Sequence, residues 1–280
     1  FKIYFEYLYI FLLMTTRQIT YYKKLDSINS GDDRITLSQS IQFTSQSSRK
    51  KLKLVAGTVS RSIPNIFNFN GENNGLVAVK RNPADDWTEI QLDNGVYNVS
   101  DITNAINKTI GDSLRWYKDN NEPALKINSN SVVQKCYITI DTSKLSSGSQ
   151  FCIKFNYKNS QMYKLLGFIN NPEISNDGMI EGSDIAQIDY FGNLISIRLN
   201  GFGNLSIFND NVSNEIATID MNSDSGSNCY KIDTTSMFPV DIYPPYDIKS
   251  YSVELVGSRN EKHIVFLEGE IKLTFQLIEE

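Results

Sequence analysis

The sequence predicts an all-β sandwich, and three observations lead to this fold class. About a dozen short stretches alternate between apolar and polar residues, which is the period of half-buried strands. Residues that favour turns interrupt the chain roughly every 8–12 residues, and only one or two short segments have helical spacing. The chain has 280 residues, of which 40% are hydrophobic and 21% charged. It is therefore globular and long enough to bury a large core, as one β domain or two smaller ones.

The first 13 residues are apolar and aromatic, with Lys2 and Glu6 among them. The stretch is too short to span a bilayer, so we expect no membrane span. It also lacks the cleavage site of a signal peptide. Met14 has the surroundings of a natural start, and we interpret residues 1–13 as translated from upstream of the true start codon. The alternative is an N-terminal strand or arm that packs on a partner.

The polar stretch 15–48 contains apolar residues too scattered for a core of its own. Segments of this composition bury too little apolar surface to order themselves. We therefore predict that residues 1–50 form an extended N-terminal arm that is ordered only by contacts.

A basic run follows, formed by Arg49, Lys50, Lys51 and Lys53. Such a run more often begins a solvated edge strand. A contact with nucleic acid through these four side chains is the weaker alternative. The formal net charge of −5 gives no reason to expect wholesale binding to nucleic acid or membranes.

Strand patterns begin at residue 51 and continue almost to the end of the chain. Alternating or buried apolar runs are bounded by clusters of Gly, Asn, Pro and Asp. The predicted strands lie at residues 51–58, 66–69, 76–79, 89–92, 124–127, 132–140, 151–157, 194–199, 205–208, 215–220, 250–256, 264–267 and 271–278.

The segment Glu89–Gly111 has the clearest local pattern. Its first residues alternate as a strand, and Asn94-Gly95 supplies a turn that tolerates a positive φ. Ser100 is predicted as the N-cap of a short helix, and Asp101 places negative charge in its first turn. Apolar residues then follow at helical spacing up to Gly111, which is placed to stop the helix.

Three segments resemble jelly-roll capsid proteins of virophages, polinton-like viruses and their relatives. The first is Asn-Gly-x-Tyr-x-Val-Ser-Asp-Ile at residues 94–102, and the second is Leu-Leu-Gly-Phe at 165–168. The third is Tyr-Pro-Pro at 243–245, followed by two closing strands with Glu-Gly-Glu at 268–270 before the second. The usual Asp-rich loop is replaced by Ser-Arg-Asn-Glu at 258–261, and together the segments extend over roughly residues 89–280.

The resemblance implies that residues 51–280 form one eight-stranded jelly roll, with a small β insertion as the alternative. The major capsid proteins of these viruses carry two jelly rolls and need about twice this length. The chain is therefore similar to their penton, the vertex protein. This implies a homopentamer at the five-fold vertices of an icosahedral shell, beside capsomers of the major capsid protein. Its expected location is the virion capsid, assembled inside the host cell.

No catalytic, cofactor or metal site is expected, so the chain is predicted not to be an enzyme and to have no small-molecule substrate. His263 is the single histidine, which excludes catalysis or metal binding by several histidines. Nothing selects Asp85/Asp86 or Asp220/Asp224 as a glycosidase pair. The loop 222–227 resembles a calcium loop but lacks its bidentate Glu. The three cysteines form no CxxC pair, and free thiols are expected.

The rival functional class is a carbohydrate-binding or adhesin-like β-sandwich. It would use Trp87, Trp116 and Tyr117 as an exposed platform for sugars. In a chain with 11% aromatic residues, such side chains more often lie in the core or in an interface.

Overall fold

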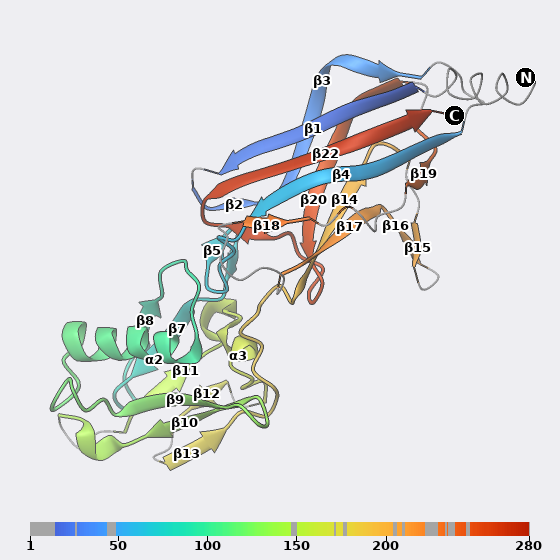
Figure 1. The fold of residues 1–280 in the computed structure, drawn as a ribbon. Helices are drawn as coiled ribbons and strands as arrows, with labels where there is room; N and C mark the ends of the chain where they lie inside the picture. The colour runs from blue at the N-terminus through green and yellow to red at the C-terminus, as the bar shows by residue number, and fades with distance from the viewer. Residues whose placement is uncertain are drawn as a thin grey trace, which may run out of the picture. The chain divides into compact units, whose positions relative to one another are not determined.

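The computed structural model describes most of the chain, and Figure 1 shows its fold. The described residues are 15–25, 27–43, 49–146, 150–170, 172–175, 178–203, 206–208, 211–221, 229–232, 234, 239–244 and 247–279. The predicted upstream translation of residues 1–13 and the start at Met14 lie outside them. In the described part of the chain, no helix is long and apolar enough to cross a membrane.

The chain divides into two compact units. One unit contains residues Phe1–Ile63 and Phe191–Glu280, and the other contains Pro64–Tyr190. We call the first the sandwich and the second the inserted domain. The inserted domain enters the sequence of the sandwich after its strand β4 and leaves it before strand β14.

The sandwich consists of two antiparallel sheets (Figure 1). The first has the strand order β1-β22-β4-β18, with β19 also paired to β4, and the second has the order β17-β14-β20-β3. Their bounds are β1 Thr15–Leu25, β3 Asp32–Gln42, β4 Lys50–Ser60, β14 Leu194–Asn200, β17 Glu215–Asp220, β18 Cys229–Lys231, β19 Val240–Ile242, β20 Asp247–Gly257 and β22 Gly269–Glu279. Two short pairs accompany them, β2 (Asn29–Ser30) with β21 (Val265–Phe266) and β15 (Ser206–Phe208) with β16 (Asn211–Ser213).

This strand order is that of a jelly roll. Let β1, β3, β4, β14, β17, β18, β20 and β22 be the first to eighth strands in chain order. One sheet then runs first, eighth, third, sixth, and the other runs second, seventh, fourth, fifth. Each half of the chain thus returns beside the other, as two interlocked Greek keys do. The predicted all-β jelly-roll class is confirmed.

The predicted arm is wrong over residues 15–42. β1 pairs with β22 over its whole length, from Thr15 opposite Glu279 to Leu25 opposite Gly269, and β3 pairs with β20. Both strands lie at the edges of their sheets. Like the other strands of the sandwich, each buries only one face. A few inward residues, among them Tyr21 and Leu25, therefore suffice, because the neighbouring central strand satisfies backbone groups on one side.

The predicted single domain over residues 51–280 also differs from the structure. Residues 64–190 form their own unit, which is larger than the small β insertion considered as the alternative. Its first sheet has the order β12-β11-β7-β8 and its second the order β13-β10-β9. The bounds are β5 Asn68–Phe69, β6 Glu72–Asn73, β7 Leu76–Lys80, β8 Thr88–Gln91, α2 Val99–Lys108, β9 Leu125–Asn130, β10 Lys135–Ile140, β11 Cys152–Lys154, α3 Met162–Leu165, β12 Glu173–Ile174 and β13 Gly178–Glu181.

Helix α2 begins two residues earlier than predicted. Asn98 is its N-cap, and its Oδ1 accepts a hydrogen bond from the Asp101 N–H at 2.9 Å. The Asp101 carboxylate accepts one from the Asn98 N–H at 3.0 Å, which completes a capping box. Ser100, the predicted cap, lies instead in the first turn. A π-helical turn at Thr109–Ser113 continues the helix.

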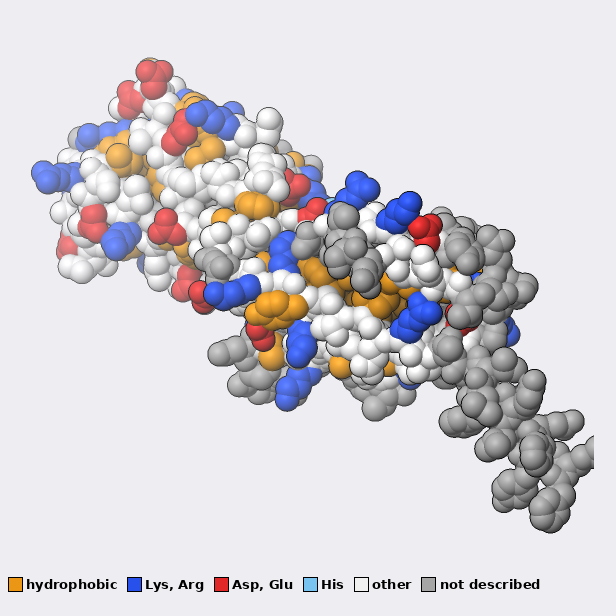
Figure 2. Space-filling view, turned by 90° about the horizontal axis from the view of Figure 1, so that it is seen from above, with side chains coloured by type: hydrophobic (Ala, Val, Ile, Leu, Met, Phe, Trp, Pro, Cys, Tyr) orange, Lys and Arg blue, Asp and Glu red, His pale blue; other side chains and the backbone are white. Residues whose placement is uncertain are grey.

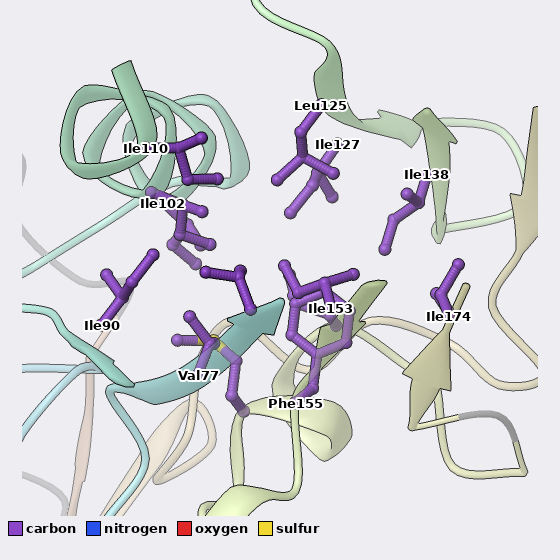
Figure 3. Close-up of a cluster of buried hydrophobic side chains, with 14 of the residues drawn as sticks. Val77, Ile90, Ile102, Ile110, Leu125, Ile127, Ile138, Ile153, Phe155 and Ile174 are labelled. Carbon is purple, nitrogen blue, oxygen red and sulfur yellow. The ribbon is translucent and has the colours of Figure 1, made fainter. Parts of the chain in front are cut away.

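The apolar side of α2 helps to close the core of the inserted domain (Figure 3). Ile102, Ile106 and Ile110 are fully buried and lie in one cluster with Val77, Leu125, Ile127, Ile138, Ile153, Phe155 and Ile174. The same helix covers the outer edge of β9. The Thr103 hydroxyl donates to the Ile127 carbonyl at 3.0 Å, and the Asn107 amide donates to the Leu125 carbonyl at 2.9 Å.

The two ends of the inserted domain are held together. The side-chain amide of Asn65 donates to the carbonyls of Tyr97 at 2.6 Å and Ile188 at 3.0 Å. The rings of Phe67 and Tyr190 meet edge to face, with centroids 5.3 Å apart. The chain therefore enters and leaves this domain at neighbouring points.

The three free cysteines differ in environment. Cys136 and Cys152 are buried and Cys229 is half-buried. Burial raises the pKa of Cys136 to about 11 and also raises the pKa of Cys152. Since the thiolate is the reactive form, we expect one thiol, that of Cys229, to react rapidly with a disulfide reagent at pH 8. All three should react in denaturant, and rapid labelling of Cys136 in the native protein would contradict this burial.

Candidate interaction surfaces

The basic run at the start of β4 does not form a single patch. Arg49 binds Asp241 through two hydrogen bonds, at 3.2 and 3.1 Å. Lys50 is 7% exposed, and its Nζ lies 5.2 Å from the centre of the Phe43 ring. Lys51 and Lys53 alternate with the buried Leu52 and Leu54 and point outward. Figure 2 shows Lys and Arg side chains spread singly over the face that it draws.

We call the outer side of the first sheet the basic face. Its middle is uncharged, because Gln18 stands opposite Gln276 and Thr20 opposite Thr274 on β1 and β22. Lysines surround this middle and outnumber the carboxylates of Glu270 and Asp241 on the same side. These lysines are Lys24, Lys51, Lys53, Lys231 and Lys272.

The outer side of the second sheet carries a row of charged residues, one from each of its four strands. Glu215, Arg198, Glu254 and Asp32 stand opposite one another in register across β17, β14, β20 and β3. Arg198 also donates to the carboxylate of Glu261. An amide row lies beside the charges, where Asn200 donates to Glu254 at 2.7 Å and to Ser252 at 3.2 Å.

His263 lies beside two carboxylates of this row. Its Nδ1 is 3.5 Å from an Asp32 oxygen and its Nε2 is 4.0 Å from a Glu254 oxygen, and all three side chains are partly exposed. The imidazole thus lies between two neighbouring carboxylates. Among the residues that the structure describes, no cluster of His, Cys, Asp and Glu could hold a metal ion.

We call the outer side of the second sheet the acidic face, because carboxylates outnumber basic side chains on it. The acidic side chains are Asp32, Glu215, Asp220, Glu254 and Glu261, and the basic ones on the same side are Arg34, Arg198 and Lys249. The sequence alone gave no sign of the row, because Arg198 and Glu254 are far apart in the chain. Alternation in β14 and β20 indicated only that both side chains point outward.

Three of the four carboxylates considered for a glycosidase pair lie among the described residues. Asp85 accepts hydrogen bonds from the backbone and side-chain amides of Asn82, at 3.0 and 3.1 Å, and so closes a turn. Asp86 is exposed beside it and Asp220 is exposed on β17. Asp224 and the loop 222–227 lie outside the described residues.

The aromatic residues of the predicted sugar platform have different surroundings. Lysines cover Trp87, with the Nζ atoms of Lys80 and Lys154 at 4.6 and 5.6 Å from the ring centre. Trp116 packs edge to face on buried Phe151 at 6.3 Å. Tyr117 is 7% exposed, its hydroxyl donates to Asn107 at 2.6 Å, and burial raises its pKa. None of these contacts aligns the three rings as one exposed surface.

Comparison with known proteins gives matches among solved structures. No protein-family profile matches the chain, and no curated protein matches it. Two of the similar solved structures come from viruses. One is the mavirus penton protein, with 14% identity, a TM-score of 0.43, and coverage of 95% of this chain and 100% of the other. Another is from the Sputnik virophage, with 12% identity, a TM-score of 0.43, and coverage of 95% and 98%.

Proposed function

We propose that this protein is a structural viral capsid protein, and that it is the penton at the five-fold vertices of an icosahedral shell. The observation that carries the proposal is the jelly-roll strand order of the sandwich. Fold alone does not define function, and the three capsid-like segments of the sequence are the second support for this role.

The segment after Tyr-Pro-Pro supplies β20 and β22, which are central strands of the two sheets. The segment at 94–102 forms the turn after β8 and the capped start of α2. The segment at 165–168 ends α3, and its Gly167 has a positive φ of 79°. Each segment therefore performs a defined structural task in its unit.

The two long edge strands of the sandwich agree with a protein that functions by binding neighbouring subunits. Edge strands β1 and β3 are 11 residues long, and long edges in natural proteins are commonly covered or charged. In a shell, neighbouring copies and major-capsid capsomers would cover them. The expected partners are four further copies of the chain and those capsomers, in a virion assembled inside the host cell. Nucleic-acid contact through Lys51 and Lys53 stays an untested prediction.

The test is the mass and symmetry of the purified chain. We expect mass photometry to show particles five times the mass of the 31.8-kDa chain, and negative-stain class averages to show five-fold rings. The measurement should extend from nanomolar to micromolar protein and from low to physiological salt, because a weakly bound ring dissociates on dilution.

A glycan array on the same sample tests the rival class. The matched variants are Trp87→Ala, which removes the lysine-covered ring, and Val132→Ala, which changes a residue 88% exposed on a turn. The capsid proposal would be overturned in favour of a sugar-binding sandwich by two results together. The wild-type chain would be a monomer at every concentration and bind glycans, and this binding would be lost in Trp87→Ala but not in Val132→Ala.

A further inference from the structure

The two outer faces of the sandwich are opposite in charge. On the basic face, lysines outnumber carboxylates around an uncharged middle of Gln and Thr pairs. On the acidic face, carboxylates outnumber basic side chains around the amide and hydroxyl groups of Asn200 and Ser252. Because the two sheets pack through their inner sides, these faces point in opposite directions from one domain.

We propose that one copy of the chain docks its basic face against the acidic face of the next copy. Each face thus binds another copy of this protein, because the two faces have complementary charges. This inference rests on the proposed assembly of the chain into rings, but it names a particular contact and can fail separately.

Such a contact is heterologous, since different surfaces of the two copies meet. Repeating a heterologous contact gives a closed ring or an open filament, whereas a contact between like faces stops at a dimer. A ring needs each copy to use two different surfaces at once, and the sandwich carries the two surfaces on separate sheets. The uncharged middle of the basic face can approach the amide row of Asn200 and Ser252 on the acidic face without burying unpaired charges. The charges around these two areas fix the register and the polarity of the ring.

Charge reversal on one face at a time tests this contact. Lys53→Glu with Lys272→Glu reverses the basic face, and Glu254→Lys with Asp220→Lys reverses the acidic face. We expect each pair to weaken self-association of the full chain about tenfold or more in sedimentation velocity. Wild-type association should weaken with added salt, because the Debye length falls from about 10 Å at 0.1 M to about 3 Å at 1 M.

The decisive variant combines both reversals. It has complementary faces again, with exchanged signs, and we expect it to recover association to within a few-fold of wild type. Matched controls carry the same changes in net charge on exposed positions of the inserted domain: Lys108→Glu with Lys126→Glu, and Asp86→Lys with Asp93→Lys. The controls should associate as wild type does, and thermal melting of all variants checks that they fold. Should a reversal unfold the chain, Lys53→Gln and Glu254→Gln replace it.

The outcomes separate this inference from the proposed function. Five-fold rings that tolerate both reversals, or a combined variant no better than the single ones, would overturn the face-to-face contact and leave the capsid proposal intact. A wild-type chain that is monomeric at every concentration would contradict both.

Discussion

Replacing Phe155 with Ala is expected to destabilise the inserted domain by about 3–5 kcal/mol. The Phe155 ring is fully buried and stacks on Phe168, with centroids 5.6 Å apart and planes 14° from parallel. It belongs to the cluster that joins both sheets of the domain to α2, so its loss leaves a cavity that surrounding rigid elements cannot fill. Urea unfolding should show a midpoint lower by on the order of 1–2 M.

Hydrogen–deuterium exchange then identifies which unit is affected. Peptides from residues 64–190 should lose protection in Phe155→Ala, while peptides from β22 and β20 should keep theirs. Val132→Ala, at a residue 88% exposed in the same domain, should change the midpoint hardly at all. Equal effects of both substitutions, or loss of protection throughout the sandwich, would contradict the assignment of Phe155 to a separate core.

Two adjacent tyrosines of β1 give the second large effect. Tyr21 is 3% exposed and points into the sandwich, whereas Tyr22 is 55% exposed on the basic face. We expect Tyr21→Ala to cost the sandwich about 3–5 kcal/mol, as other large-to-small changes of buried aromatic residues do. Tyr22→Ala loses a long hydrogen bond to Glu270 at 3.3 Å and should cost under about 1 kcal/mol.

Limited proteolysis provides a direct readout of β1. In the wild-type chain, residues 15–25 should resist cleavage because their backbone pairs with β22. In Tyr21→Ala the same segment should become the first site of cleavage, with Tyr22→Ala unchanged. Rapid cleavage within β1 of the wild-type protein would instead support the arm that the sequence predicted.

The parts of the fold that the sequence predicts well are those with strong alternation. β22 buries Ile271, Leu273, Phe275 and Leu277 and leaves the residues between them exposed or half-buried, so its pattern is unambiguous. The sequence predicts an arm in place of β1 and β3 because an edge strand needs few apolar residues and depends on a neighbour for pairing. The neighbour of Thr15 is Glu279, and no local pattern reveals a partner at that separation.

The division into units was also beyond local patterns. Strands of the inserted domain, such as β7 and β10, alternate or are apolar in the same way as those of the sandwich. Periodicity tells which residues are buried but not which core they enter. Local patterns could not reveal the charged row on the acidic face either. The register across four strands brings its members together, and these are Glu215, Arg198, Glu254 and Asp32.

The joined ends of the inserted domain bear on how the chain folds. A jelly roll that pairs β1 with β22 has many contacts between distant residues, and such topologies fold slowly because large loops must close first. The inserted domain separates β4 from β14, yet Asn65 and the Phe67–Tyr190 contact bring its two ends together. Once this domain has folded, the effective connection between β4 and β14 is only a few residues long. Each halving of a loop lowers the entropic cost of closure by about 0.6 kcal/mol, so early folding of the insertion lowers the barrier for the sandwich by about 3 kcal/mol.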